Sequence, residues 1–300
     1  MSSGRFALPF LALCIAGPAL AEPPQVVTDI APVHSLVASV MQGVATPALI
    51  VQSGASPHEY SLRPSDAAAL QNAGVVFWMG AELTPWLDGA IETLTDDALI
   101  VTLLEHDETR LLAFRESMLF EAHDHAGSDH HDDGHGHEHD HDHAPGESDP
   151  HAWLSPDNAR TWLDLIAREL SSVDPENAAA YAANALTAIA GIDAVEAEVT
   201  ALLDPLRGSG YVVFHDAYQY FEDAFDFPAS GAIALSDAAD PSPARIAGIQ
   251  TRIADQNIVC VLSEPQFNPG IIATVMAGSE TRTAVLDPLG SDLTPGPALY

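Results

Sequence analysis

The stretch of residues 174–205, DPENAAAYAANALTAIAGIDAVEAEVTALLDP, decides how this chain is organised. Asp174 followed by Pro175 is typical of a helix start, because aspartate can cap free N–H groups and proline suits the first turn. Apolar residues, most of them three or four positions apart, then continue as far as Pro205. They are Tyr181, Leu186, Ile189, Ile192, Val195, Val199 and Leu202. We expect one helix of about 30 residues, roughly 45 Å long, which is enough to join two lobes.

On both sides of this helix, strand-like and helix-like patterns alternate. Short apolar runs predict strands at 26–28, 48–51, 75–78, 99–103, 211–214, 231–235, 259–262 and 283–286. Helical patterns occupy about 32–41, 85–94, 156–171, 241–254 and 269–276, and the segment 61–66 leads into another helix that runs to about Gln71. This βαβα order is typical of a parallel sheet with helices on its faces. We expect an α/β protein with two lobes of parallel-type sheet, at 22–172 and 207–300, joined by one long rigid helix within 173–206.

The first 21 residues have the features of a secretory signal peptide. Met1 to Arg5 is a short, positively charged start, and Phe6 to Pro18 is an apolar run too short to span a bilayer. Ala19-Leu20-Ala21 matches a signal-peptidase site. We therefore expect cleavage after Ala21 and a protein of the bacterial periplasm. The rest of the chain has no stretch of about 18 uninterrupted apolar residues, so we expect no membrane span.

Charge and cysteine content exclude several classes of partner and site. The formal net charge is −33, and all ten basic residues are arginines. Such a field repels phosphate backbones and anionic lipid surfaces, so we expect no nucleic-acid partner and no direct membrane insertion. Without the signal peptide Cys260 is the single remaining cysteine, and its apolar surroundings at 258–262 predict a buried strand. A zinc site built on cysteine is therefore excluded.

Histidines are concentrated in one short segment. Nine of the fourteen lie between His123 and His143, interleaved with Asp, Gly and Glu. Short histidine-rich tracts are typical of divalent transition-metal binding, because neutral imidazole binds zinc, nickel and copper. The alternative is a solvated, acidic, disordered loop without a fixed site. We expect a histidine-rich loop over residues 121–149.

The remaining ligand-type residues stand alone, and several of them follow predicted strands. His58 lies in a loop after the strand that ends near residue 51, and His215 directly follows 211–214. Asp287 directly follows another strand, and His151 follows the histidine-rich loop. Open α/β sheets bind ligands beyond the carboxyl ends of their strands. Because these residues come from both halves of the chain, we expect them to meet in a crevice between the lobes.

Five ordered segments resemble the zinc-uptake substrate-binding proteins of the ZnuA type, in the metal-binding branch of ABC-transporter binding proteins. They are Gly54-Ala-Ser-Pro-His-Glu-Tyr-Ser-Leu-Arg-Pro-Ser-Asp66, Pro150-His-Ala-Trp-Leu-Ser-Pro156, Val213-Phe-His-Asp-Ala-Tyr218, Ser263-Glu-Pro-Gln-Phe267 and Leu286-Asp-Pro-Leu-Gly290. The resemblance runs from about Val26 to Tyr300. It implies two α/β lobes joined by a long rigid helix, a metal site between them, and an acidic histidine-rich loop.

The resemblance also implies a ligand set. His58, His151 and His215 match the three metal-binding histidines of the family, and Asp287 matches its C-terminal carboxylate. Manganese and iron members usually have a carboxylate at the position of His215. Three imidazoles with at most one carboxylate suit Zn²⁺, whereas harder ions prefer more oxygen. We expect zinc bound as cargo, with a water as the alternative to Asp287.

Two departures from the family pattern affect these expectations. Some zinc members have a glutamate directly before the first histidine, where this chain has Pro57; Glu59 ranks lower as a ligand because it faces away in an extended loop. Family members continue with a C-terminal helix beyond the segment matching 295–300, and some place there a cysteine that pairs with the one matching Cys260. We expect either a truncated sequence or a protein without that helix and its disulfide.

His34 and Glu264 are candidates for groups behind the ligands, although a packed or surface role suits His34 better.

The sequence thus predicts capture and delivery of Zn²⁺, not catalysis. The expected partners are an inner-membrane ABC permease and its cytoplasmic ATPase, and we expect a monomer. One alternative is a periplasmic zinc buffer or chaperone that acts mainly through the histidine-rich loop. The other is a secreted zinc hydrolase, in which an open fourth position activates water. The sequence contains no His-Glu-x-x-His pair that would support the hydrolase.

Overall fold

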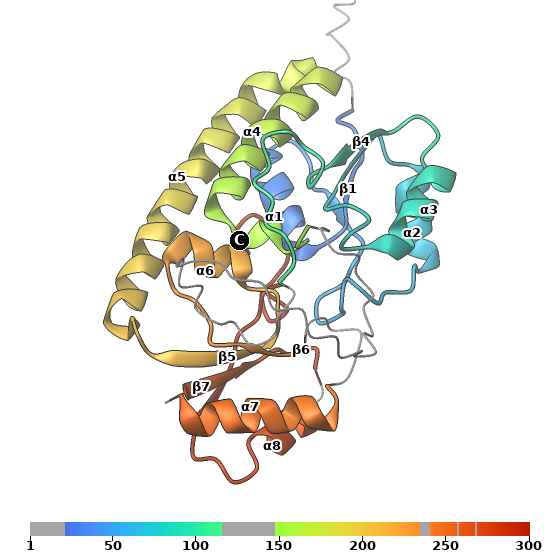
Figure 1. Ribbon diagram of the computed structural model, residues 1–300. Coiled ribbons are helices and arrows are strands. Elements are labelled where there is room, and N and C mark those ends of the chain that lie inside the picture. Colours follow the sequence, from blue (N-terminus) through green and yellow to red (C-terminus); the bar gives the residue numbers. More distant parts are fainter. Residues whose placement is uncertain (1–21, 116–147, 235–240, 257, 268) are drawn as a thin grey trace, which may run out of the picture.

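The computed structural model describes residues 22–115, 148–234, 241–256, 258–267 and 269–300. Each lobe is built on a four-stranded parallel sheet (Figure 1). The first has the order β2-β1-β3-β4 and the second β6-β5-β7-β8. The strands are β1 Val26–Thr28, β2 Ala48–Leu49, β3 Val75–Trp78, β4 Leu99–Thr102, β5 Gly210–His215, β6 Ala232–Ala234, β7 Ile258–Ser263 and β8 Arg282–Val285. The predicted fold class, two parallel-sheet lobes flanked by helices, is confirmed.

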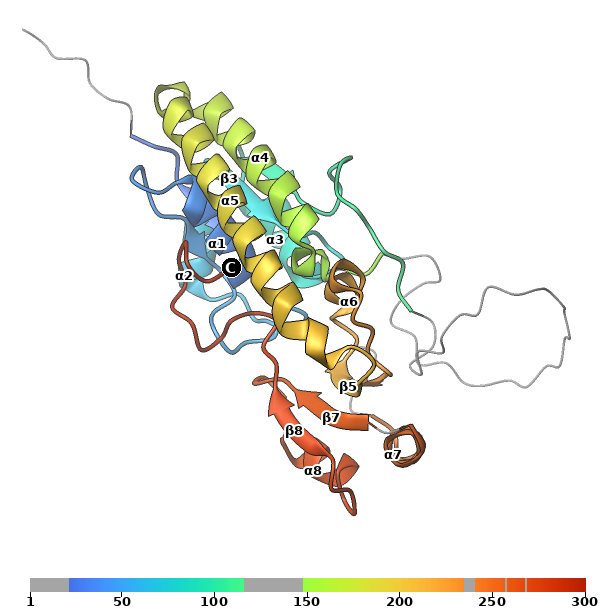
Figure 2. The same ribbon diagram turned by 90° about the vertical axis from the view of Figure 1, so that its left-hand side faces the viewer.

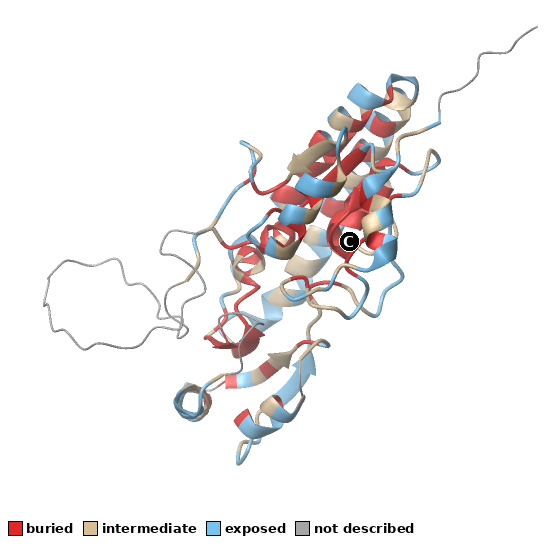
Figure 3. Ribbon diagram, turned by 90° about the vertical axis from the view of Figure 1, so that its right-hand side faces the viewer, coloured by how far each residue is buried: buried red, intermediate tan, exposed pale blue. Residues whose placement is uncertain are grey.

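Helices cover both faces of the first sheet. They are α1 Ala31–Val40, α2 Pro64–Gln71, α3 Pro85–Leu94 and α4 Pro156–Val173. One core lies between the sheet and α1, α4 and α5, and a second lies between the other face and α2 and α3. All four residues of β3 are buried, as expected for a central parallel strand covered on both faces. Figure 3 shows this buried interior.

The long helix α5 spans Ala178–Leu203, with single 3-10 turns at Pro175–Asn177 and Asp204–Leu206. It lies alongside α4 and ends near β5, so it joins the lobes (Figures 1 and 2). Its buried residues are Tyr181, Ala185 and Ile192, whereas Leu186, Val195 and Leu202 are exposed. The helix was predicted correctly, but its apolar stripe only in part: Tyr181 and Ile192 are buried and Ile189 packs against the core. Ala185 is also buried and Ala188 packs against the same core, so small side chains supply part of the contact with α4 and α1.

The second lobe has three helices in its described residues: α6 Gln219–Phe225, α7 Pro243–Asp255 and α8 Pro269–Val275. Side chains of α7 and α8 form a core with one face of the sheet. Helix α6 was not predicted. It is only seven residues long, and its Tyr220 is buried in the core of the first lobe. This short helix therefore lies where the two lobes meet.

Two predictions fall on residues outside the described part of the chain. They are the signal peptide at 1–21 and nearly all of the histidine-rich loop, including every histidine from His123 to His143. Among the described residues, no helix is both long enough and apolar enough to cross a membrane. The domain boundaries at residues 172 and 206 stay predictions.

Candidate metal centre

Three of the four predicted ligands come together. His58, His151 and His215 each offer a ring nitrogen, and these three atoms all lie within 4.8 Å of one another. No other cluster of three or more such residues occurs in the described part of the chain. His58 belongs to the loop between β2 and α2, His151 precedes a 3-10 turn at Ala152–Leu154, and His215 ends β5. The cluster therefore combines side chains from both lobes.

The loop that carries His58 is held by α3. The indole Nε1 of Trp86 donates to the carbonyl oxygen of Pro57 at 2.7 Å. The ring of Tyr60 lies against that of Trp86, with centroids 5.3 Å apart. The backbone N–H of His58 donates to the hydroxyl of Ser56 at 3.2 Å. His58 is half-buried, whereas the other two histidines are 3% exposed, so it lies nearest to solvent.

His151 is fixed by a buried carboxylate two residues earlier. Asp149 Oδ1 accepts from the backbone N–H of His151 at 2.9 Å and contacts its ring Nδ1 at 2.7 Å. The backbone of Asp149 is also held in place. Its N–H donates to the carbonyl oxygen of Leu112, and its carbonyl oxygen accepts from the Tyr220 hydroxyl, both at 2.8 Å. Asp149 therefore sets both the position and the tautomer of the His151 ring.

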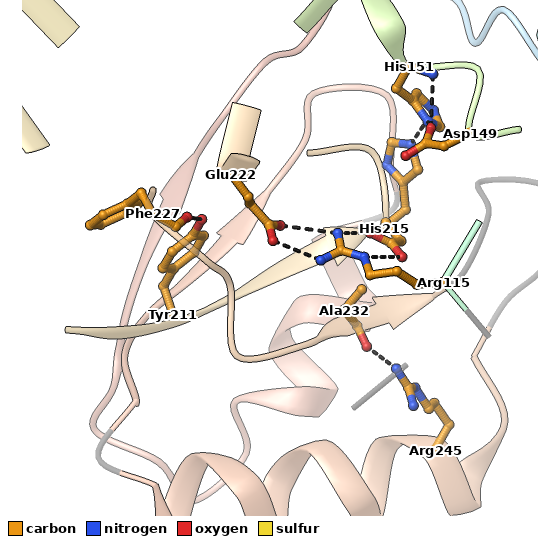
Figure 4. A network of polar contacts seen from close by, with 10 residues as sticks. Arg115, Asp149, His151, Tyr211, His215, Glu222, Phe227, Ala232 and Arg245 are labelled. Atoms are coloured by element: carbon orange, nitrogen blue, oxygen red, sulfur yellow. Dashed lines mark hydrogen bonds and ion pairs between the residues drawn. The ribbon is translucent and has the colours of Figure 1, made fainter. Parts of the chain in front are cut away.

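His215 has an equivalent partner on the neighbouring strand. Its Nδ1 lies 2.6 Å from Oε1 of Glu264, which directly follows β7 and is 4% exposed. The other carboxylate oxygen of Glu264 accepts from Nε2 of Gln266 at 2.8 Å. Because β5 and β7 pair in parallel, their carboxyl ends bring His215 and Glu264 together. Figure 4 shows His151 and His215 facing one another beside Asp149.

These contacts leave the Nε2 atoms of His151 and His215 facing each other at 3.4 Å. Each Nδ1 faces a carboxylate, so in the neutral ring Nδ1 carries the hydrogen and Nε2 keeps its lone pair. Two lone pairs at this separation repel unless a cation lies between them. With Zn–N bonds of about 2.0–2.1 Å, a tetrahedral zinc site has nitrogen atoms about 3.3–3.4 Å apart. The pair thus has the spacing of two zinc ligands.

The three rings line a small cavity of about 10 Å³, which has room for about one ion or water molecule. The other lining residues are Pro57, Trp153, Gln266, Pro288 and Leu289. Trp153 closes one side, because its Nε1 donates to the carbonyl oxygen of Pro288 at 2.9 Å. The wall therefore joins residues from both lobes and is mainly apolar apart from the histidines and Gln266.

Asp287, the fourth predicted ligand, does not join the group of three histidines. Its Oδ1 accepts from the backbone N–H groups of Leu289 at 3.0 Å and Gly290 at 3.1 Å. Its Oδ2 accepts from the backbone N–H and the hydroxyl of Ser291. A carboxylate has about four acceptor positions, and this turn uses all four. Asp287 therefore shapes the turn that carries Pro288 and Leu289 into the cavity wall.

Three other residues with ligand-type side chains lie outside the cluster. Glu59 is exposed. His34 is buried in α1, with Nε2 3.1 Å from the carbonyl oxygen of Pro47, and burial lowers its pKa. His106 contacts Arg168 on the surface. Of the two residues considered as groups behind the ligands, Glu264 contacts a histidine of the cluster, whereas His34 is a packed residue.

A buried ion cluster ties the first lobe to the strand that carries His215. Arg115 pairs with Asp216, the residue after His215, and with Glu222 of α6 at 2.8 Å (Figure 4). Burial raises the pKa of Asp216 to about 6, although the Arg115 guanidinium opposes that rise. Nearby, the backbone N–H of Leu112 donates to the Tyr220 hydroxyl at 2.9 Å. Residues 110–115 therefore hold α6 and the end of β5 against the first lobe.

Comparison with known proteins identifies the family. The model of the family "Zinc-uptake complex component A periplasmic", ZnuA, matches residues 26–300. The chain belongs to the ZnuA family. A ZnuA relative, the high-affinity zinc uptake system protein of Brucella abortus, is 45% identical over 289 residues, covering 92% of this chain and 86% of the relative. The protein of the same name from Paracoccus denitrificans is 43% identical, with 94% and 89% covered.

Solved structures of the ZnuA family show the same fold. A crystal structure of ZnuA has a TM-score of 0.72 and 21% identity, covering 90% of this chain and 93% of that one. A zinc-bound ZnuA mutant lacking residues 138–173 of its own chain gives a TM-score of 0.72 at 21% identity, with 90% and 92% covered. Family membership makes this chain a periplasmic zinc-uptake component rather than an enzyme, so the hydrolase alternative is not supported.

Three residues that contact or support the histidine cluster were not predicted from the sequence. Asp149 carried a signal, since an acidic residue two positions before a candidate ligand can reach its ring. Gln266 lies within a segment that resembles the family, but its side chain carries no metal-ligand signal of its own. Arg115 could not be found from sequence, because its partners, Asp216 and Glu222, are about a hundred residues away.

Proposed function

We propose that the chain captures Zn²⁺ between its lobes through His58, His151 and His215. The observation that carries this proposal is the 3.4 Å separation of the Nε2 atoms of His151 and His215, whose Nδ1 atoms both face carboxylates. Three imidazoles suit zinc better than manganese or calcium, which prefer more oxygen ligands. The names of the Brucella and Paracoccus relatives, both high-affinity zinc uptake proteins, support zinc as the cargo.

Buried charge also favours a divalent cation at this place. Asp149 and Glu264, each at most 4% exposed, lie directly behind two of the histidines. Burying carboxylates is costly unless they are paired. A Zn²⁺ ion on the other side of the imidazole rings would compensate both negative charges. The same carboxylates raise the basicity of the rings and fix their orientation.

For the fourth position we propose two steps that involve Asp287. Its carboxylate accepts four hydrogen bonds in the turn at 287–291, so it can bind zinc only by releasing at least one of them. We propose that zinc enters with a water molecule as fourth ligand. Asp287 then releases its hydrogen bonds in the turn and replaces the water as fourth ligand. The zinc is then bound by four protein side chains.

For delivery, we propose an inner-membrane ABC permease with its cytoplasmic ATPase as the partner. The long α5 and the buried contacts of residues 110–115 with α6 hold the lobes together, so loading should cause small tilts and loop ordering rather than wide closure. The chain would act as a monomer, exported to the periplasm after cleavage behind Ala21. The histidine-rich loop would collect zinc weakly and pass it to the three-histidine site.

A titration of zinc against a competing chromophoric chelator tests this proposal. The mature protein and a variant lacking Ala122 to Ala144 are compared, with Mn²⁺ as the control ion. We expect one tight zinc equivalent in both proteins and far weaker manganese binding. Loss of tight binding in the deletion variant would overturn the proposal, because the loop would then be the main site and a zinc buffer or chaperone the better description.

A further inference from the structure

Gln266, which lines the cavity beside the three histidines, has a buried polar atom without a hydrogen-bond partner among the described residues. It lies three residues after β7. Its Nε2 donates to Glu264 Oε2 at 2.8 Å, but its Oε1 is buried and has no hydrogen-bond partner among the residues that the structure describes. A buried acceptor without a donor costs free energy. Such an atom in a binding cavity points to a ligand that brings the missing hydrogen.

The orientation of this amide follows from its neighbour. A carboxylate only accepts hydrogen bonds, so the NH₂ group of Gln266 must face Glu264. The carbonyl oxygen then has to point away from Glu264. Swapping the two atoms would set an oxygen against the carboxylate and is excluded by that repulsion. The unpaired atom is thus an acceptor, fixed in place by the residue that holds His215.

Several groups in the cavity wall cannot supply this hydrogen. Pro57 and Pro288 have no N–H group, and the indole N–H of Trp153 is used by the carbonyl oxygen of Pro288. The backbone N–H of Leu289 donates to Asp287. The Nδ1 atoms of His151 and His215 face Asp149 and Glu264, and their Nε2 atoms are acceptors. A water molecule that arrives with the metal is a donor that suits Gln266.

We infer that Gln266 Oε1 accepts a hydrogen bond from a water molecule bound to zinc, and so holds the fourth coordination position while Asp287 remains in its turn. This inference rests on the proposed function. A water on zinc is a strong donor, because the metal lowers its pKa far below that of bulk water. Gln266 thereby stabilises the form in which zinc first enters, and it disfavours ions that cannot hold a water at this position.

The test uses the full mature chain with Asp287→Asn, which removes the competing carboxylate ligand. In this background we compare Gln266→Met with Gln250→Met. Gln250 is a matched control, because it lies on α7 and donates to the carbonyl oxygen of Thr274 away from the cavity. Zinc affinity is measured by chelator competition, and the visible absorption of the Co²⁺-loaded protein reports the ligand set.

We expect Gln266→Met to weaken zinc binding at least tenfold and to shift the cobalt absorption bands, and Gln250→Met to change neither. An affinity within twofold of the parent would overturn the inference. A weaker affinity with unchanged cobalt bands would also overturn it, since Gln266 would then act only by positioning Glu264. Failure of the proposed function is a separate result: the mature protein without substitutions would show no tight zinc binding, or His215→Ala would leave tight binding intact.

Discussion

The Nε2 atoms of His151 and His215 lie 3.4 Å apart, although the two residues belong to different lobes. Each ring is held from behind by its own buried carboxylate, Asp149 or Glu264. The protein thus fixes two nitrogen lone pairs at the separation that tetrahedral zinc requires. The two lone pairs repel each other in the empty site. A cation that binds both nitrogen atoms removes this repulsion.

Removing any one of the three histidines should abolish tight zinc binding. Because each ring supplies one of only four bonds, we expect His58→Ala, His151→Ala and His215→Ala each to weaken zinc binding by at least about 100-fold. Chelator competition measures this change. His106→Ala is the control, since His106 is a surface residue outside the cluster. A control as damaging as the three variants would show that the loss is not specific.

The carboxylates behind the rings should matter nearly as much as the ligands. Asp149→Asn and Glu264→Gln leave shape almost unchanged but weaken the interaction that fixes each Nδ1–H. We expect a loss of about 10- to 100-fold in zinc affinity for each. Isothermal titration with a competing chelator gives the value. An unchanged affinity in both variants would mean that packing alone orients the rings.

Asp287→Asn separates the two candidates for the fourth ligand. Asparagine can keep part of the turn at 287–291, because its carbonyl oxygen still accepts hydrogen bonds. If Asp287 closes the site after zinc enters, we expect zinc to dissociate about 10- to 100-fold faster from the variant. Stopped-flow transfer to a chelator measures this rate. The wild-type rate in the variant would assign the fourth position to water throughout.

Much of this fold could be predicted because its signals are local. The buried runs of β3 and β5 and the proline-started helices α3 and α4 show their character within their own residues. Helix α6 was missed because seven residues carry too little periodicity. The buried face of α5 was predicted only in part, because Ala185 is buried whereas Leu186 and Leu202 are exposed.

The candidate site was predictable only in part. Histidines and an aspartate after strands could be recognised one by one, and the resemblance assigned them together. The hydrogen bonds of Asp287 could not be foreseen, because they depend on how the backbone turns at 289–291. The role of Arg115 was equally hidden, since its partners come from the other lobe.

Removing Arg115 from its ion cluster should lower the free energy of unfolding far more than removing Arg110, which forms an exposed ion pair with the same helix, α6. Arg115→Met would leave Asp216 and Glu222, 3% and 6% exposed, without their cation, and we expect a loss of about 3–5 kcal/mol in the free energy of unfolding. Arg110→Met is the matched control. Its pair with Asp223 is exposed, so we expect at most about 1 kcal/mol. Urea denaturation of the zinc-free proteins compares them, and equal losses would contradict this ranking.

Stability should also depend on pH through Asp29. Burial raises the pKa of this carboxyl from 3.8 to about 7, although it accepts hydrogen bonds from the N–H groups of Ile30 and Met79. Between these pH values the unfolded chain releases a proton that the folded chain retains. The contribution of Asp29 is therefore fully present below about pH 4 and is lost as pH rises through about 7.

The variant Asp29→Asn isolates this effect. We expect the stability of the wild type relative to the variant to fall by more than about 1 kcal/mol between pH 4 and pH 7.5, measured on zinc-free protein by urea denaturation. Comparing the two proteins cancels the titration of the histidines, which they share. A constant difference across this range would mean that folding does not raise the pKa of Asp29.

The most direct test of zinc binding by these three histidines is a crystal structure of the zinc-loaded mature protein, with anomalous diffraction data collected at the zinc absorption edge. We predict one strong anomalous peak between the lobes, about 2.0–2.1 Å from a ring nitrogen of each of His58, His151 and His215. A peak elsewhere, or one bound by fewer than three of these histidines, would show that they do not form the zinc site.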